Sequence, residues 1–442
     1  MKIEESFRNF YNEIHLSNTA TFDSAIKSIT KKLNEKYYAE KDIDFETANC
    51  IIVGSIGRGT AIKNTSDVDM LFILPWSVYY RFDNYTFNGQ SSLLQEIKAE
   101  ISERYPRTDI KGDGQAVVIE FGNFSIDLVP AFENTDGSFE HPDSNNGGSW
   151  KNTNPMPEQN KSSSINVSTN NNFVQLANMI RCWKDNEGFV FGGLLIDTLV
   201  YEFLENNTKY WRVNFSEYID VIKNLLKFLS EKNENSTIYA LGSRQVVRDK
   251  GNGKYISKAK TYYDKLSNSK TMTELENVFI AMFGNRFKKN MVEGVSDYVI
   301  KSYMQRYGCN NTEEFIEDLF PINIRYSLRL NCNVRTNGWR VRLLREIKII
   351  PFHRNLEFYI ESTNVPKPYK IYWKVRNMGE EAYKRNQIRG QIVKGEDTKK
   401  EKSSFNGPHY VECYLIKNGI CVARDIITVN IQAGAIDGLE VV

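Results

Sequence analysis

The feature of the sequence that most constrains its fold is the stretch VGSIGRGTAIKNTSDVDMLFIL, residues 53–74. It places a glycine-rich loop just before two aspartates, Asp67 and Asp69, which begin a strongly apolar run. Taking a carboxylate out of water costs several kcal/mol unless something compensates its charge. Within the stretch only Arg58 and Lys63 could do so, and a bound metal ion would do it better. We therefore expect a cation-binding site at the start of a buried strand.

Length and composition indicate a globular protein of several domains. A chain of 442 residues is too long for one ordinary core, so we expect two or three domains. No stretch approaches the roughly 18 consecutive apolar residues of a membrane span, and the N-terminus lacks the apolar core of a signal peptide. We therefore expect a cytoplasmic protein with no membrane partner.

The cysteines show neither the spacing of a zinc site nor a disulfide framework. They are scattered, with no C-x-x-C pair and no neighbouring histidine cluster. The four histidines also lie far in sequence from the aspartates, so we expect no catalytic histidine. We expect reduced packing residues at all six cysteines, which are Cys50, Cys182, Cys309, Cys332, Cys413 and Cys421.

The first 133 residues combine helical and strand patterns. Apolar residues recur at helical spacing from Phe22 to Leu33, which predicts an amphipathic helix over residues 20–38. The short apolar runs ANCIIVG and VDMLFIL are bounded by turn residues and predict strands. Two further runs, QAVVIEF and FSIDLVPAF, flank Gly122-Asn123 and predict a β-hairpin. The segment is therefore expected to be mixed α/β.

A polar segment separates this part from a helical one. Residues 134–172 are rich in Asn, Ser and Gly, which predicts a long loop. Trp150 in this segment either stacks on a base at the mouth of an active site or anchors the loop on the protein. Beyond it, FVQLANMIRCWKDN carries apolar residues on one helical face, and further helical patterns run to about Phe320.

The last part of the chain changes to a period of two. In YKIYWKVRN apolar and polar residues alternate, and a hairpin turn is expected at Asn418-Gly419, so the tail predicts a β-rich domain. From Pro321 onward there are 21 Lys+Arg against 12 Asp+Glu, a charge of +9, which leaves 36 against 43, or −7, for the rest. Only the tail is basic.

Aromatic and basic residues mix in this tail, a composition typical of nucleic-acid surfaces. A solvated face of a β-sandwich would have the same composition. The residues are Tyr372, Trp373, Lys374, Arg376, Lys384, Arg385 and Arg389.

Three aspartates have the pattern of a site for divalent cations. On a strand, Asp67 and Asp69 point to the same face with about 7 Å between their attachment points. Asp127 interrupts the apolar run FSIDLVPAF, where a structural residue would be Val or Ile. Mg²⁺ prefers oxygen ligands and is commonly held by carboxylates together with substrate phosphates. The pattern therefore predicts two Mg²⁺ ions at these three side chains, with Mn²⁺ as a substitute.

Gly54 and Ser55 precede the aspartates at an expected strand-to-helix turn. Exposed backbone N–H groups and a hydroxyl at such a turn can hold a triphosphate, and the glycine lets the chain approach closely. The alternative is an ordinary turn, with Asp67 as a capping or turn aspartate. The combination of the Gly-Ser turn, the D-x-D pair and Asp127 favours a nucleotidyltransferase site.

These residues resemble a known family. GSIGRGTAIKNTSDVD together with IDLVPAF is similar to the polymerase β-type nucleotidyltransferases and, within them, to the bacterial CD-NTases of the SMODS type, relatives of cyclic GMP-AMP synthase and oligoadenylate synthetase. WKNTNP, MIRCWKDN and VFIAMFGNRF also resemble CD-NTase segments. The tail, from IYWKVRN to ARDIITVNI, is similar to the AGS-C domain, a C-terminal sensor module.

The resemblance implies a three-part chain and a role for each matched residue. It implies a polymerase β-like α/β catalytic core over residues 1–165, a helical lobe over 166–320 and a β-rich sensor domain over 321–442. Asp67, Asp69 and Asp127 match the catalytic metal ligands, and Gly54 and Ser55 match the triphosphate loop. Lys184 matches a lysine that contacts the donor phosphates, with a solvated helix-end lysine as the alternative. Near Gly193 a serine of many relatives is replaced by glycine, which puts one phosphate contact in doubt.

The resemblance also implies the activity. It is the Mg²⁺-dependent synthesis of a cyclic oligonucleotide second messenger from nucleoside triphosphates, ATP among them, in bacterial antiphage defence of the CBASS type. RNA or another activating ligand at the C-terminal domain and a downstream effector that binds the product are the partners it suggests. Two alternatives stay open: a linear product or nucleotide transfer to RNA or protein, and a catalytically silent protein that only binds RNA or a partner.

Overall fold

The structure is a computed structural model that describes residues 2–288, 312–335, 342–344, 349–377, 380–404 and 407–431. Cys309 and the part of the predicted helical region from residue 289 to 311 lie outside these ranges. By its internal contacts the chain divides into two units, one of residues 3–183 and 191–281 and the other of residues 184–190 and 282–442. The predicted domain boundaries at residues 165 and 320 stay predictions.

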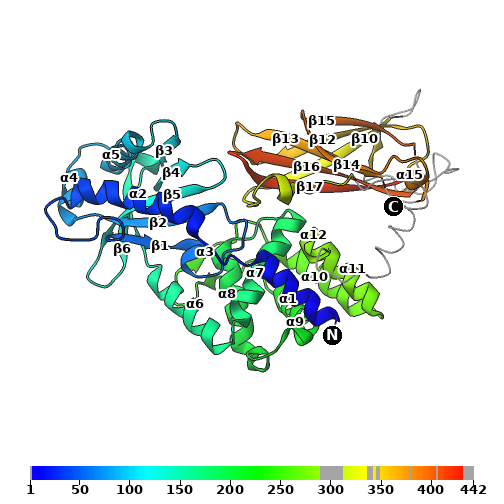
Figure 1. The fold of residues 1–442 in the computed structure, drawn as a ribbon, viewed down its shortest axis with the longest axis horizontal. Helices are drawn as coiled ribbons and strands as arrows, with labels where there is room; N and C mark the ends of the chain where they lie inside the picture. The colour runs from blue at the N-terminus through cyan, green and yellow to red at the C-terminus, as the bar shows by residue number, and fades with distance from the viewer. Residues whose placement is uncertain are drawn as a thin grey trace. The chain divides into compact units, whose positions relative to one another are not determined.

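The first unit contains a mixed sheet with the strand order β1-β2-β5-β4-β3 (Figure 1). β2 and β5 are parallel, and the other neighbours in this order are antiparallel. β6 and β7 extend the sheet from β5. The strands are β1 (Cys50–Ile52), β2 (Asp67–Ile73), β3 (Asp109–Asp113), β4 (Ala116–Glu120), β5 (Ser125–Glu133), β6 (Phe139–Asp143) and β7 (Ser149–Thr153). The predicted strands and the hairpin at Gly122-Asn123 are confirmed.

Helices cover one face of this sheet. The amphipathic helix predicted over residues 20–38 is α2 (Ala20–Tyr37), and it packs with α4 (Trp76–Asp83) and α5 (Gly89–Arg104). Their apolar side chains form one buried cluster with alternate residues of β2, β4 and β5. Each fully buried aliphatic side chain stabilises the fold by about 1.5–3 kcal/mol. The side chains between these alternate residues point to the opposite face.

The rest of the first unit is mainly helical, as predicted. The helices are α1 (Lys2–Ile14), α3 (Gly54–Gly57), α6 (Met156–Ser168), α7 (Asn172–Glu187), α8 (Gly193–Asn206), α9 (Tyr218–Ser230), α10 (Lys254–Asn268) and α11 (Met272–Phe283), with short 3-10 turns η1 (Asn145–Gly147), η2 (Thr208–Tyr210) and η3 (Phe215–Glu217) and a small hairpin of β8 (Ile238–Tyr239) and β9 (Val246–Val247). The ends of α7 and α11 belong by contacts to the second unit. No helix in the described ranges has the length and apolarity needed to cross a membrane.

The prediction of a long loop over residues 134–172 is wrong. The segment forms β6, β7 and all of α6, because backbone pairing of short strands at a sheet edge needs few apolar side chains. Trp150 lies on β7, where its indole nitrogen donates to Asp83 Oδ1 at 2.9 Å and its ring lies 4.5 Å from that of Tyr79. Its role as an anchor of this segment is thereby confirmed.

The second unit contains the predicted β-rich domain, in which two antiparallel sheets pack face to face. One sheet has the order β11-β10-β12-β15 and the other β14-β13-β16-β17. Their strands are β10 (Leu328–Arg335), β11 (Arg342–Leu343), β12 (Asn355–Thr363), β13 (Lys370–Asn377), β14 (Arg389–Gly395), β15 (Thr398–Lys402), β16 (Gly407–Lys417) and β17 (Ile420–Ile431), and the short helices are α12 (Asn285–Lys288), α14 (Ile316–Leu319) and α15 (Glu380–Lys384). The hairpin at Asn418-Gly419 is confirmed, with both residues at positive φ (52° and 77°).

Neither a nucleic-acid surface nor a solvated face includes Trp373, Lys374 and Arg376, because these side chains are buried. Trp373 is 1% exposed and belongs to the core between the sheets. The Lys374 ammonium, 3% exposed, lies 3.0 Å from Glu313 and 3.3 Å from Glu412. Residues from 313 to 324 cover this outer face of the second sheet, so both faces of β13 are buried.

The remaining members of that predicted surface have other contacts. Tyr372 packs in the same covering cluster, and Arg385 and Arg389 form ion pairs with Glu381 and Glu401. Lys384 is exposed. Of the cysteines, Cys182, Cys332, Cys413 and Cys421 are buried free thiols, and Cys50 is a half-buried one, consistent with packing roles.

Candidate active site

Three aspartates meet on one face of the first unit's sheet. β2 and β5 are parallel, and their register pairs Asp69 with Asp127 and Asp67 with Ser125. Neighbouring Cα atoms across a sheet lie about 5 Å apart. Asp67, Asp69 and Asp127 are half-buried, whereas Val68 and Ile126 between them are fully buried against the helices. The alternation that buries the apolar residues therefore puts all three carboxylates on the opposite face.

Gly54 lies directly against one of these carboxylates. Its φ is +64°, and a Cβ atom on it would stand 1.8 Å from Asp69 Oδ2. The backbone nitrogen of Val53 donates to the Asp69 carbonyl oxygen at 2.9 Å, which fixes the loop on β2. Only glycine fits here, because any side chain would both strain the backbone and clash with the aspartate.

Ser55 follows in the first turn of α3. Its carbonyl oxygen accepts hydrogen bonds from the backbone nitrogens of Thr60 and Ala61 at 2.9 and 3.1 Å, which closes the glycine-rich loop on itself. The Ser55 hydroxyl forms no hydrogen bond with any residue in the described ranges, so it is available to a ligand. The predicted members Gly54, Ser55 and Asp69 are thus brought together.

The donor chemistry of the three aspartates fits a hard divalent cation. In the described part of the chain, no group of three acidic, histidine or cysteine side chains is arranged so that it could hold a metal ion as it stands. Like charges repel, and a cation between neighbouring carboxylates removes that repulsion. The strand register sets the backbone positions, and rotation of the side chains would bring the oxygens toward one ion. Asp67, Asp69 and Asp127 would therefore hold Mg²⁺ or Mn²⁺ as oxygen ligands.

The cations of the glycine-rich loop have other partners. Within the stretch of residues 53–74, Arg58 and Lys63 are the only cations that could compensate the aspartates. Instead, Arg58 Nε lies 2.8 Å from Asp197 Oδ2 and Nη1 lies 3.7 Å from Glu158. Lys63 forms a long, exposed pair of 4.0 Å with Glu13. Arg58 thus ties the loop to the helical part of the first unit.

Asp197 is the centre of a buried network that the sequence did not reveal. This carboxylate, fully buried on α8, accepts from Arg58, from Arg181 Nη1 and Nη2 at 2.7 and 2.9 Å, and from the Thr60 hydroxyl at 2.8 Å. Burial alone raises the pKa of Asp197, but the two guanidiniums outweigh it and hold that pKa below its usual range. Burial also raises the pKa of Glu158. One signal was present: an aspartate within the apolar helix LLIDTLV.

The glycine at position 193 has a structural consequence. A Cβ on Gly193 would stand 3.3 Å from Arg181 Nη2, and the same guanidinium donates to the Gly193 carbonyl oxygen at 3.0 Å. Two arginine side chains, Arg181 and Arg58, thus occupy the space beside Gly193.

Lys184 is buried and bonded within the second unit. Its ammonium pairs with Asp185 and lies 3.4 Å from the Ile324 carbonyl oxygen, while the Ile324 nitrogen donates to Asp185 at 3.3 Å. The side chain is 9% exposed, which differs from a solvated helix-end lysine. A contact between Lys184 and donor phosphates stays a prediction.

Comparison with known domain families gives two matches. Residues 1–166 match the Second Messenger Oligonucleotide or Dinucleotide Synthetase (SMODS) domain. Residues 310–432 match the Adenylyl/Guanylyl and SMODS C-terminal sensor domain. A probable cyclic nucleotide synthase of Bacillus cereus is 23% identical over 205 residues, and this match spans 40% of the present chain and 59% of the relative. The chain therefore matches less than two thirds of that relative's length.

Two solved structures are among those similar to part of this chain. The structure of Escherichia coli CdnC with HORMA-deltaN has a TM-score of 0.48 and 15% identity, and the match covers 65% of this chain and 98% of that one. Vibrio cholerae DncV, a cyclic AMP-GMP synthase with a bound linear intermediate, has a TM-score of 0.48 and 10% identity, covering 66% of this chain and 99% of that one. The two family matches show that this chain carries a second messenger oligonucleotide or dinucleotide synthetase domain followed by a SMODS C-terminal sensor domain.

Proposed function

We propose that this protein synthesises a cyclic oligonucleotide from ribonucleoside triphosphates, with ATP among its substrates, and releases pyrophosphate. The observation that carries the proposal is the parallel register that places Asp69 beside Asp127, with Asp67 on the same face and Gly54 in contact with Asp69. The match of residues 1–166 to the synthetase domain supports it.

The chain's own residues suit nucleotidyl transfer. Gly54 lets the backbone approach a triphosphate closely, and the Ser55 hydroxyl donates a hydrogen bond to one of its oxygens. The acceptor ribose hydroxyl attacks the α-phosphorus, its proton passes to Asp127, and the bond from the α-phosphorus to the pyrophosphate oxygen breaks. When bound to the three aspartates, Mg²⁺ or Mn²⁺ lowers the pKa of the acceptor hydroxyl and neutralises charge on the leaving pyrophosphate.

Cyclisation is the finer part of the proposal. It requires the linear intermediate to present its own triphosphate and its other ribose hydroxyl in the same site for a second transfer. The match to a synthetase domain for second messengers supports this step. A role in antiphage defence of the CBASS type is proposed on the sequence resemblance alone.

The test is product analysis. The purified protein is incubated with all four NTPs and Mg²⁺ or Mn²⁺, with and without RNA, then treated with phosphatase and analysed by mass spectrometry. A phosphatase-resistant oligonucleotide that is absent with Asp67→Asn/Asp69→Asn supports the proposal. A phosphatase-sensitive product indicates linear synthesis, and no product under any condition indicates a binding protein; both contradict cyclic synthesis.

The matched control variant is Asp109→Asn. Asp109 lies on β3 of the same sheet, with its side chain 61% exposed and paired with Lys111. This variant removes an aspartate from the sheet without touching the proposed site, so we expect normal product formation.

A further inference from the structure

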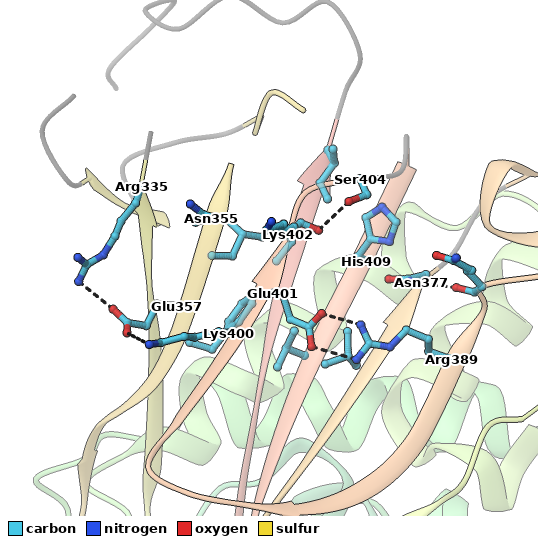
Figure 2. A pocket seen from close by; sticks show the side chains of 17 residues that line it. Arg335, Asn355, Glu357, Asn377, Arg389, Lys400, Glu401, Lys402, Ser404 and His409 are labelled. Carbon is cyan, nitrogen blue, oxygen red and sulfur yellow. Dashed lines mark hydrogen bonds and ion pairs between the residues drawn. The ribbon is translucent and has the colours of Figure 1, made fainter. Parts of the chain in front are cut away.

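The sensor domain contains a cavity that none of the preceding functions uses. It lies between the two sheets of the second unit and has a volume of about 820 Å³ (Figure 2). The residues that line it lie at one end of the β-sandwich and come from both sheets. They are at the last residues of β10, β13, β15 and β17 and at the first residues of β12, β14 and β16. Pockets of 300–1,000 Å³ typically hold small organic ligands.

The inner part of this cavity is apolar. Phe358 and Val375 line it from facing sheets, together with Val411 and Ile431, and all four belong to the core between the sheets. Water bound there would find few polar partners, so an apolar group of a ligand is favoured. Two buried polar side chains, Asn377 and His409, 7% and 4% exposed, also line the cavity and give a ligand a means of orientation.

The outer part of the cavity carries an excess of positive charge. Its lining contains four lysines and arginines against two glutamates. Glu357 lies between Arg335 at 3.0 Å and Lys400 at 3.9 Å, and the Glu401 carboxylate accepts hydrogen bonds from Arg389 Nη1 and Nη2 at 2.6 and 2.9 Å (Figure 2). Each carboxylate is therefore already neutralised by cations.

Lys402 is the cation of this lining that has no ion pair within the described ranges. It is the last residue of β15, and its side chain is exposed. Its ammonium can therefore meet a ligand's negative group without first breaking a salt bridge.

We propose that this cavity binds a small organic anion, with the apolar body of the ligand between the sheets and its phosphate or carboxylate at Lys402. The proposal concerns the second unit alone and does not rest on the proposed synthetase activity.

The test uses the fluorescent probe 1-anilinonaphthalene-8-sulfonate, which likewise combines an apolar body with a negatively charged group. The probe is titrated into the full chain at low salt. We expect saturable binding that Lys402→Glu weakens about tenfold, since charge reversal replaces attraction by repulsion. The matched control is Lys394→Glu, an exposed lysine of β14 outside the cavity, which should change the affinity less than twofold. N-phenyl-1-naphthylamine, the same body without the sulfonate, should bind both variants alike.

Competition separates the two headgroup chemistries. Displacement of the Lys402-dependent probe by adenosine monophosphate assigns the site to organic phosphates, and displacement by decanoate assigns it to carboxylates. Equal affinities of the wild type and Lys402→Glu overturn the proposal, and so does displacement by neither competitor, which means adventitious probe binding only. The Asp67→Asn/Asp69→Asn variant should bind the probe normally, so failure of the synthetase proposal and failure of this one are distinguishable.

Discussion

Substitution of Asp197 tests whether the buried network holds the glycine-rich loop. Asp197→Ala removes the common partner of Arg58, Arg181 and Thr60 and leaves two guanidiniums with side chains only 7% and 6% exposed. Breaking a buried ion pair by removing one partner costs about 3–5 kcal/mol, because the remaining charge loses its compensation. Here Arg58 keeps only its longer contact of 3.7 Å with Glu158 among the ion pairs of the described residues. We therefore expect the free energy of unfolding of the first unit to fall by about that amount.

The assay is urea unfolding followed by tryptophan fluorescence. Four of the six tryptophans, Trp76, Trp150, Trp183 and Trp211, lie in the first unit, so the signal reports mainly on its transition. With a slope of about 2–3 kcal/mol per molar urea, the midpoint should fall by about 1–2 M. The matched control is Asp264→Ala on α10, an exposed aspartate, whose effect should stay within about 0.5 kcal/mol. Equal midpoints for the two variants would refute the reasoning.

The pH dependence gives an independent check of the same network. Because the folded-state pKa of Asp197 is depressed, its ionised form contributes stability that is present above the unfolded pKa of about 4 and is lost as pH falls below it. The difference in unfolding free energy between the wild type and Asp197→Ala should therefore be constant from pH 7 to 5 and shrink below about pH 4. A difference that grows on acidification would contradict this assignment.

Three further predictions follow from single contacts. Gly54→Ala should lower pyrophosphate release at least about 100-fold, because its Cβ would stand 1.8 Å from Asp69 Oδ2. The control Gly59→Ala, at φ +70° and with no atom within 4 Å of its Cβ, should cost only about 1 kcal/mol of backbone strain. Similar turnover in both variants would refute the close approach of Gly54 to Asp69. If Lys184 contacts donor phosphates, Lys184→Ala raises the KM for NTP. Asp185→Ala breaks the same ion pair but keeps the Lys184 ammonium, so it should leave the KM unchanged. An equal KM in both variants would show that Lys184 has a structural role alone. Lys374→Met should destabilise the second unit by about 3 kcal/mol, because Glu313 and Glu412 lose their shared cation. The control is Lys370→Met, at an exposed position of β13. Equal melting temperatures of the two variants would contradict this prediction.

The parts of the site that follow local patterns could be predicted from sequence. An apolar run interrupted by Asp127, and the D-x-D pair at the start of another, define strands with carboxylates on one face, because side-chain direction alternates residue by residue. The left-handed turn at Gly54 is likewise a local feature. The pairing of Asp69 with Asp127 is not local, since it depends on the register of two strands 58 residues apart in sequence.

The parts that depend on distant partners were missed or mistaken. Arg58 and Asp197 are 139 positions apart, and nothing near Arg58 in the sequence indicates which carboxylate it meets. In β13 the alternation separates Ile371 and Trp373 from the basic side chains, but the composition groups Trp373 with them and predicts that the basic face is accessible. It is covered by the chain around Glu313, and burial of Lys374 is compensated there by two glutamates.

The most direct test of the proposed site compares single substitutions of its three aspartates. Pyrophosphate release from NTPs is measured with Mn²⁺ for Asp67→Asn, Asp69→Asn, Asp127→Asn and the control Asp109→Asn. Loss of one carboxylate ligand should lower turnover by about three powers of ten or more, since several kcal/mol of transition-state stabilisation disappear, while Asp109→Asn should match the wild type. Near-normal turnover in any of the three site variants would contradict the assignment of that aspartate, and near-normal turnover in all three would remove the proposed active site.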